Sequence, residues 1–178
     1  MKIVTIGGHG FTRATFVAAL HAARVDTFVD LRRRRGMRGA AYAFLNRARL
    51  EALLARERIR YVYIPELAPT PAIRDLQRQA DEAHHQTAHT RERLSPAYVR
   101  AYERDVLAHF DRAAFAARVG AASVVALFCV EGPPALCHRA LVARAFAGGR
   151  ARHLIAKAEG AAVSAARGRR AAGRRGSP

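Results

Sequence analysis

Short apolar runs rich in β-branched residues alternate along the chain with longer segments whose apolar residues recur at helical spacing. Residues 2–6 are followed by three glycines within residues 7–10, which predicts a buried strand that enters a tight turn. Thr12 is typical of a helix N-cap, and a second strand is expected over residues 25–31. This order predicts a βαβ unit at the start of the chain.

The alternation continues through the rest of the sequence, where proline, glycine and polar capping residues separate the elements. The predicted elements are a loop over residues 32–45, a helix capped by Asn46, a strand over 61–64 stopped by Pro65, a helix from Ser95 and Pro96 to before Gly120, a strand over 123–130, a helix over 134–146 and a weak edge strand over 153–155. The run 123–130 is the most apolar, which favours a central strand buried on both faces.

Strands that alternate with helices predict an α/β fold, with a mostly parallel sheet and helices on both faces in a Rossmann-like, three-layer arrangement. Residues 66–94 interrupt the rhythm with a polar helix that carries His84, His85 and His89, and we interpret this segment as an insertion over the sheet. We expect residues 1–155 to form a single domain. Residues 156–178 have the composition of a basic, disordered tail.

In a parallel α/β sheet, ligands bind outside the carboxyl ends of the strands, so the site is expected where polar residues follow the strands. The candidate catalytic residues at this edge are Glu131, Asp30, His9, Cys137 and His138. The candidate ligand- or phosphate-binding residues are Arg32, Arg139, Gly8, Gly10 and Glu66.

Composition narrows the class of protein. The chain has 178 residues, of which 51% are apolar, enough for one ordinary domain with a real core. Its two cysteines are too few to staple a secreted protein of this length, and no apolar run is long enough to cross a bilayer. We therefore expect a cytoplasmic protein with reduced thiols and no membrane partner.

The formal net charge of +17 predicts a phosphate-bearing partner, either a nucleotide or nucleic acid. Residues 32–49 hold seven arginines and no acid, which concentrates positive charge in one segment. The arginines expected to contact nucleic acid are Arg33, Arg34, Arg35, Arg38 and Arg47. A GC-rich coding sequence would explain why arginine replaces lysine, but it would not explain the excess of arginine over acids.

The segment 129–139 runs from the buried strand through a Gly-Pro turn to the start of a helix. The free amides and positive dipole of a helix start, together with Arg139, favour an anion at this place. Glu131 on the turn would face the same ligand, which makes it a candidate general acid or base. The alternative is a structural ion pair between Glu131 and Arg139 or Arg32.

Four motifs in this order carry a family resemblance: T-I-G-G-H-G over residues 5–10, V-D-L-R over 29–32, R-Y-V-Y-I-P-E-L over 60–67 and C-V-E-G-P-P-A-L-C-H-R over 129–139. With them, the chain resembles the family catalogued as domain of unknown function 488 over roughly residues 3–146. The resemblance implies a polar set made of His9, Asp30, Arg32, Glu131, Cys137, His138 and Arg139. It implies no established activity.

Three interpretations of function remain open from the sequence. The favoured one is an enzyme that acts on a nucleotide or nucleic acid, with arginines on phosphate and Glu131 or Asp30 in proton transfer. The second is a cysteine-dependent sulfurtransferase or phosphatase-like enzyme that uses Cys129 or Cys137. The third is a nucleic-acid-binding domain without catalysis. Zinc is not expected, because Cys-x7-Cys followed directly by histidine is not a familiar ligand spacing.

Overall fold

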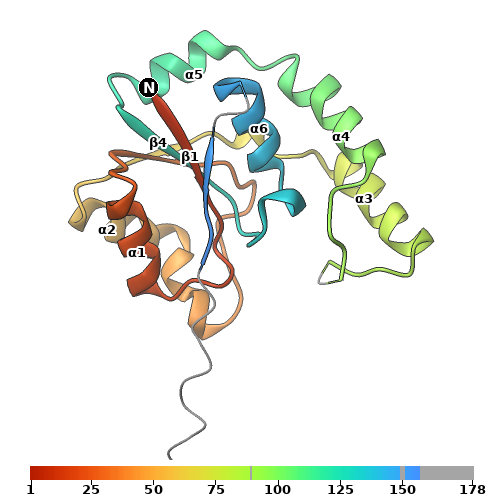
Figure 1. Ribbon diagram of the computed structural model, residues 1–178, viewed down its shortest axis with the longest axis horizontal. Helices are drawn as coiled ribbons and strands as arrows, with labels where there is room; N and C mark the ends of the chain where they lie inside the picture. Colours follow the sequence, from red (N-terminus) through yellow and green to blue (C-terminus); the bar gives the residue numbers. More distant parts are fainter. Residues whose placement is uncertain (89, 149–150, 157–178) are drawn as a thin grey trace, which may run out of the picture.

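A five-stranded parallel sheet forms the centre of the computed structural model, which describes residues 1–88, 90–148 and 151–156 (Figure 1). The strands are β1 (Lys2–Ile6), β2 (Thr27–Asp30), β3 (Arg60–Tyr63), β4 (Val124–Phe128) and β5 (Arg152–Leu154). Their order is β3-β2-β4-β1-β5, and every pair is parallel. The predicted α/β fold is confirmed, and the most apolar run does supply the middle strand.

Helices lie on both faces of this sheet, as the alternating pattern predicted. The α-helices are α1 (Arg13–Ala22), α2 (Arg47–Arg56), α3 (Pro71–Ala83), α4 (Pro96–Tyr102), α5 (Arg112–Val119) and α6 (His138–Ala147). The shorter turns are the 3-10 helices η1 (Ala40–Leu45), η2 (Pro65–Leu67) and η4 (Pro134–Leu136) and the π-helical turn η3 (Glu103–Leu107). The expected loop over residues 32–45 thus contains η1.

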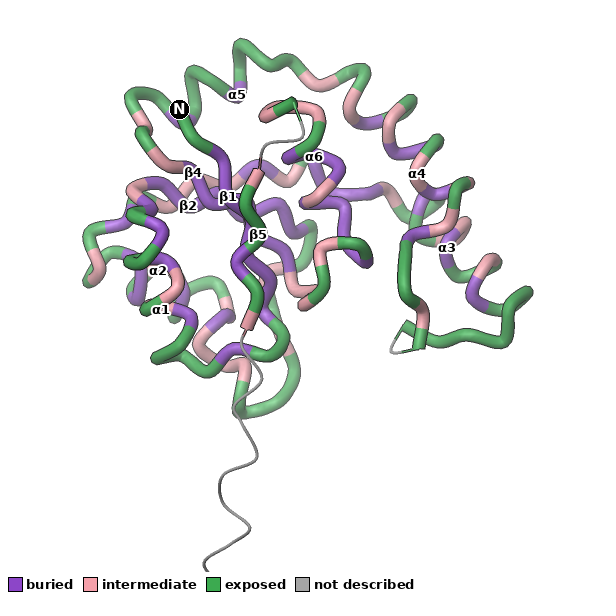
Figure 2. The backbone as a smooth tube through the Cα atoms, in the orientation of Figure 1, coloured by how far each residue is buried: buried purple, intermediate pink, exposed green. Residues whose placement is uncertain are grey.

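Two hydrophobic cores, one on each face, hold the layers together. Phe16 of α1 and Leu54 of α2 belong to the first core, and Tyr102 of α4 and Val142 of α6 belong to the second. Strand β4 contributes alternate residues to both cores, which explains why its sequence is apolar throughout. Figure 2 shows β1, β2 and β4 largely buried, whereas much of the edge strand β5 and the outer faces of the helices are exposed.

Capping residues fix where several helices begin. The Thr12 side chain accepts a hydrogen bond from the Thr15 amide, and Ser95 accepts one from the amide three residues later, as predicted. Asn46 occupies the N-cap position of α2, but its side chain accepts from the Met37 amide across the preceding loop. Asn46 therefore closes the arginine-rich loop and does not cap the helix with its side chain.

The single helix predicted from Pro96 to before Gly120 is wrong. The chain leaves the helix after Leu107, and α5 begins beyond Asp111, whose carboxylate accepts from the Ala113 amide at 2.7 Å. Aspartate competes for free backbone amides and so favours a new helix start. The hydrophobic spacing continued across the break because both helices contribute to the same core.

The helix predicted over residues 134–146 begins later than expected. Prolines open a short 3-10 turn, Cys137 adopts an extended conformation at the N-cap, and α6 starts at His138. The free amide groups of this helix therefore lie beside the cysteine and the histidine, and not beside the prolines.

The segment over residues 66–94 forms η2, α3 and the loop that follows. Helix α3 packs on α4, at the side of the molecule away from α1 and α2 (Figure 1). Ile73 and Leu94 are buried in the core that α4 and α6 share, so the segment contributes to the domain core.

Two predicted features fall outside the described residues: His89, and all of the predicted tail except Ala156. In the described part of the chain, no helix is both long and apolar enough to span a membrane.

Candidate active site

A cleft of about 550 Å³ opens at the carboxyl edge of the sheet. The loops after β2 and β4 form one side, the start of α6 forms the floor, and α3 with its following loop forms the other side. The chain leaves β2 toward one face of the sheet and β4 toward the other, and such a point is where α/β sheets bind ligands. The predicted edge therefore does carry a cleft.

Three side chains of types that can ligate a metal meet at the floor of this cleft. Cys129 follows β4 directly, and Cys137 and His138 stand at the start of α6. His138 Nδ1 lies 3.9 Å from Cys129 Sγ and 3.8 Å from Cys137 Sγ, and all three residues are buried. The sequence placed Cys137 and His138 among the candidate catalytic residues, whereas Cys129 entered as an alternative nucleophile and as a ligand in a zinc site that was not expected.

The two thiols have different acidities. The hydrogen bond with Cys137, together with burial, raises the pKa of Cys129 well above its ordinary value. Burial also opposes ionisation of Cys137, but the hydrogen bond with Cys129 and the nearby charges of His138 and Arg139 bring its pKa well below the ordinary value. The pair thus favours a thiolate at Cys137 and a thiol at Cys129.

Glu131 lines the same cleft, two residues beyond Cys129. Its carboxylate lies 4.0 Å from His9 Nδ1, and the His9 ring contacts Tyr42 edge to face. Burial and the nearby Cys137 raise the pKa of Glu131, while the charge of His9 opposes this shift. Glu131 therefore pairs with His9, and neither Arg139 nor Arg32 forms an ion pair with it in the described structure.

The turns after β1 and β4 are locked together. The amides of Gly8 and His9 both donate to the Val130 carbonyl, at 3.0 and 2.9 Å. A Cβ on Gly7 would lie 2.0 Å from the Glu131 carbonyl oxygen, so only glycine permits this approach. The glycines thus fix the backbone of the cleft floor; Gly8 and Gly10 do not line the cleft.

Arg139 completes this lock. Its side chain is fully buried and donates to the Glu131 carbonyl at 2.5 Å and to the Gly132 carbonyl at 2.6 Å. Nη1 and Nη2 donate these two bonds, and Arg139 does not line the cleft. In the structure it holds the Glu131 turn in place, so its predicted contact with a ligand stays a prediction.

Asp30 and Arg32 form a buried ion pair beside the floor. Arg32 donates to the Asp30 carboxylate through Nε and Nη2, the latter at 2.8 Å, and its Nη1 donates to the Leu45 carbonyl. The guanidinium also lies 4.7 Å from the centre of the Phe128 ring. Tyr61 donates to the same carboxylate. Both charges are thus satisfied within the protein, and proton transfer by Asp30 stays a prediction.

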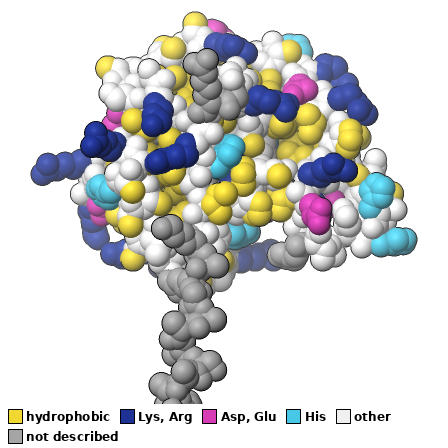
Figure 3. All heavy atoms as spheres, in the orientation of Figure 1, with side chains coloured by type: hydrophobic (Ala, Val, Ile, Leu, Met, Phe, Trp, Pro, Cys, Tyr) yellow, Lys and Arg dark blue, Asp and Glu magenta, His cyan; other side chains and the backbone are white. Residues whose placement is uncertain are grey.

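The remaining predicted residues lie in different surroundings. Arg33 and Arg34 line the cleft, and Arg38 is exposed beyond it. Arg35 stacks on the Tyr63 ring at 3.9 Å. Both Arg35 and Arg47 pair with Glu51, and Glu66 is held outside the cleft by a two-pronged pair with Arg118. Figure 3 shows lysine and arginine spread over the face viewed, separated by hydrophobic side chains.

Sequence reasoning missed the wall that α3 supplies. Gln77 and Asp81 are buried, and Asp81 accepts from Gln77 Nε2 at 2.7 Å and from Arg91 Nη1 at 2.9 Å. Arg74 and Arg78 from the same helix also line the cleft. The signal was present: Gln77 and Asp81 follow Ile73 at helical spacing, so two polar residues occupy the inward face of α3.

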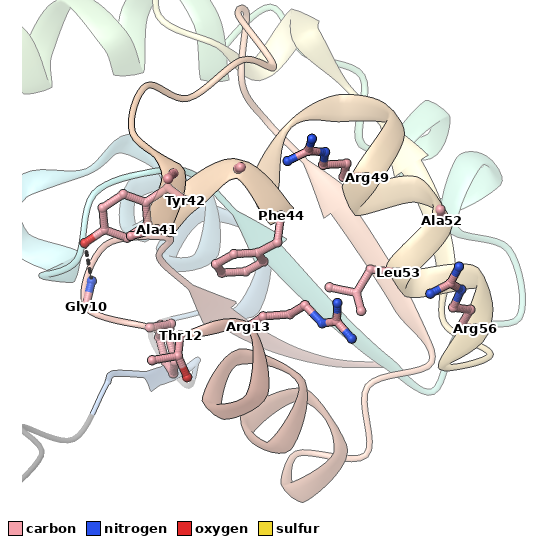
Figure 4. Close-up of a pocket in the computed structure, with 13 residues that line it drawn as sticks. Gly10, Thr12, Arg13, Ala41, Tyr42, Phe44, Arg49, Ala52, Leu53 and Arg56 are labelled. Carbon is pink, nitrogen blue, oxygen red and sulfur yellow. Dashed lines mark hydrogen bonds between the residues drawn. The ribbon is translucent and has the colours of Figure 1, made fainter.

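A second, larger cavity of about 830 Å³ lies on the other side of the sheet, between α1, η1 and α2 (Figure 4). Arg13, Arg49 and Arg56 surround an apolar floor that includes Phe44 and Leu53. Among the described residues, its lining contains arginines but no acid, histidine or cysteine. The cavity can attract an anion, but its hydroxyl groups, Thr12 and Tyr42, have no such residue in the lining to activate them, so the cleft over Cys137 is the better candidate active site.

Comparison with known proteins identifies the family. No curated protein and no solved structure matches this chain. The family model described as "Domain of unknown function DUF488" matches residues 12–146, from the N-cap of α1 to the last turn of α6, and includes the whole Cys129–Arg139 segment. Of the motifs that suggested this resemblance, the segment 129–139 supplies the cleft floor, and Arg32 of the motif over 29–32 also lines the cleft. The chain belongs to the DUF488 family.

Proposed function

We propose that the protein is an enzyme that acts on a nucleotide or on nucleic acid, held by phosphate in the cleft above Glu131. The observation that carries this proposal is the composition of the cleft: arginines line its walls, and Glu131, Cys137 and His138 lie along its base. A volume of about 550 Å³ is within the ordinary range for small-molecule sites, roughly 300–1,000 Å³.

Three of the lining arginines are free to hold an anion. Arg33, Arg34 and Arg74 form no ion pair with any residue that the structure describes. Arg32 is instead paired with Asp30, and Arg91 with Asp81, so their charges are already neutralised within the protein. A guanidinium matches phosphate with two parallel hydrogen bonds, and each charge-assisted bond contributes about 1.5–3 kcal/mol. Phosphate is therefore the group that this wall recognises best.

Glu131 is the acid/base candidate because its carboxylate stands on the turn after β4 and lines the cleft, where it can face a bound ligand. The Arg139 clamp and the contact with Gly7 fix the backbone of that turn, so the Glu131 side chain has a defined origin. His9, at 4.0 Å, is the ion-pair partner of Glu131 among the described residues. A positioned carboxylate can accept a proton from an attacking water or donate one to a leaving group.

Substitution of the arginines tests the binding part of the proposal. ATP, GTP and single- and double-stranded oligonucleotides would be screened by thermal shift at low and high salt. Replacement of Arg33, Arg34 and Arg74 by alanine should weaken binding at least about tenfold, because at least one charge-assisted bond is lost. The matched control replaces three arginines in the second cavity: Arg13, Arg49 and Arg56. Equal losses in both variants would contradict recognition by the cleft.

Glu131→Gln tests the catalytic part. The amide is nearly isosteric, so the variant should keep its melting temperature and its affinity while turnover of the bound ligand, followed by chromatography, is lost. Turnover that survives in Glu131→Gln would refute the role of this carboxylate.

A second candidate function is cysteine-dependent group transfer. The position of Cys137 favours it, since a cysteine that lines a cleft at the start of a helix is in a place where a thiolate is stabilised. Mass spectrometry of the intact protein after acid quench separates the two mechanisms. A covalent adduct on Cys137 during turnover supports the thiol nucleophile, and its absence supports acid/base chemistry by Glu131.

A further inference from the structure

We propose that Cys129, Cys137 and His138 bind one zinc-class divalent ion, with a fourth coordination position open to the cleft. The three donor atoms, two Sγ and His138 Nδ1, lie within 4.8 Å of one another and come from two elements that the fold brings together. Their sequence spacing is unusual for zinc, but coordination depends on the positions of the donor atoms in space.

The distances fit a tetrahedral site. Zinc bonds of about 2.3 Å to sulfur and 2.0–2.1 Å to nitrogen place tetrahedral donors roughly 3.6–3.8 Å apart. The two Sγ–Nδ1 distances are 3.9 and 3.8 Å. The two sulfur–nitrogen distances are thus within a few tenths of an ångström of tetrahedral values, and the two sulfurs lie within 4.8 Å of each other, so they need to approach by at most about 1 Å to bind one ion.

The surroundings of His138 agree with this assignment. The ring is 6% exposed, Nδ1 faces the two sulfurs, and Nε2 has no hydrogen-bond partner among the described residues. The ring of Tyr102 lies 5.7 Å away and restricts the histidine from another side. Among the described residues, the two sulfurs are thus the hydrogen-bond partners of this ring, and the same orientation presents Nδ1 and both sulfurs to one shared ion.

The chemistry of the donor set selects the ion. Two thiolates and an imidazole are ligands that zinc prefers over magnesium or calcium, and two thiolate charges balance one divalent ion in a buried place. Three protein ligands with an open fourth position are typical of catalytic zinc sites. All three residues line the cleft, so the open position would face the bound ligand.

The ion would also give Glu131 a specific task, an extension that rests on the proposed function. Zinc lowers the pKa of a bound water, and a neighbouring carboxylate that is not a ligand can accept its proton. Glu131 lines the same cleft as the three ligands. The Glu131 carboxylate would accept a proton from that water as the water oxygen forms a bond to phosphorus of the ligand; the bond from phosphorus to the leaving oxygen would break, and Glu131 would return the proton to that oxygen.

Metal content provides the test. The protein, free of any histidine tag and reduced before dialysis, would be loaded with zinc and analysed by elemental mass spectrometry. One ion per chain is expected, and Cys137→Ser should reduce this to below about 0.1. The matched control replaces His84 and His85, two exposed histidines outside the cluster, and should keep the full content.

Cobalt provides a second readout that needs no variant. Replacement of zinc by cobalt should produce the sulfur-to-cobalt charge-transfer and visible bands of a tetrahedral thiolate site. If Cys137→Ser fails to fold, these bands in the unmodified protein decide the question. Reduced, folded protein without stoichiometric metal or cobalt bands, or a Cys129–Cys137 disulfide that forms in place of metal binding, would overturn the proposal. Stoichiometric metal in a protein that binds no phosphate ligand would leave this inference standing and refute the proposed function.

Discussion

Asp30→Asn is the substitution that best separates a structural role from a functional one at the carboxyl edge. The Asp30 side chain is completely buried and accepts from the Arg32 guanidinium, the Arg32 amide and the Tyr61 hydroxyl. Loss of its charge leaves the Arg32 guanidinium buried without a counter-ion. Removing one partner of a buried pair costs about 3–5 kcal/mol, and the remaining amide oxygen places the expected loss near about 3 kcal/mol.

Urea denaturation gives the free energy of unfolding, and a thermal melt gives an independent check. For a chain of this size, a loss of about 3 kcal/mol corresponds to a fall in melting temperature of roughly 6–12 °C. Asp75→Asn is the control, since Asp75 pairs with Arg78 on the surface and should change stability by less than about 0.5 kcal/mol. Addition of Arg32→Met to Asp30→Asn should recover part of the loss, because both buried charges are then absent.

The result that refutes this reasoning is equally definite. A change of less than about 1 kcal/mol in Asp30→Asn would mean that Arg32 finds other partners or water, at odds with the loss expected for a buried pair. A loss of turnover without a loss of stability would return Asp30 to the catalytic role that the sequence predicted.

Three further substitutions test other parts of the structure. Tyr102→Phe removes the buried hydroxyl that donates to the Leu67 carbonyl at 2.6 Å and should lower the free energy of unfolding by about 1–3 kcal/mol; an unchanged urea midpoint would contradict this. Gly7→Ala should lower the melting temperature and disturb the Glu131 turn, because its Cβ meets a backbone oxygen; a crystal structure with an unmoved turn would contradict it. Burial lowers the pKa of His153, so the unfolded chain takes up its proton first and the free energy of unfolding falls as the pH drops below about 6.5. His153→Gln should therefore lose less stability than the unmodified protein between pH 7 and 5. The same dependence of unfolding free energy on pH in both proteins would contradict this.

The sequence predicted the layers of this fold because each layer has a strong local signal. Strand β4 is apolar throughout because both its faces are covered, and Thr12 and Ser95 mark helix starts with side chains that satisfy free amides. The edge at which polar residues gather follows from the parallel direction of the strands. These features depend on neighbours in sequence, which a single chain reveals.

The composition of the site depended on contacts between distant residues and was harder to predict. Arg139 and Arg32 have the charge of ligand-binding residues, but the fold uses both to satisfy buried carbonyls or a carboxylate. The convergence of Cys129 with His138 depends on where α6 begins, and this start was displaced by the short turn at Pro134. A sequence pattern gives residue types and spacing, whereas these roles depend on the direction of individual side chains.

The lock that Arg139 and Gly7 form has a consequence for how this family can diversify. It ties the turn after β1 to the turn after β4, so the floor of the cleft behaves as one rigid piece. The walls carry no such constraint, because Arg33, Arg34 and Arg74 reach the cleft from a loop and from the exposed face of α3. Mutations in the walls can therefore change which ligand binds while the reactive groups beneath keep their geometry. We expect relatives with the same floor motif to share the type of reaction more often than the substrate.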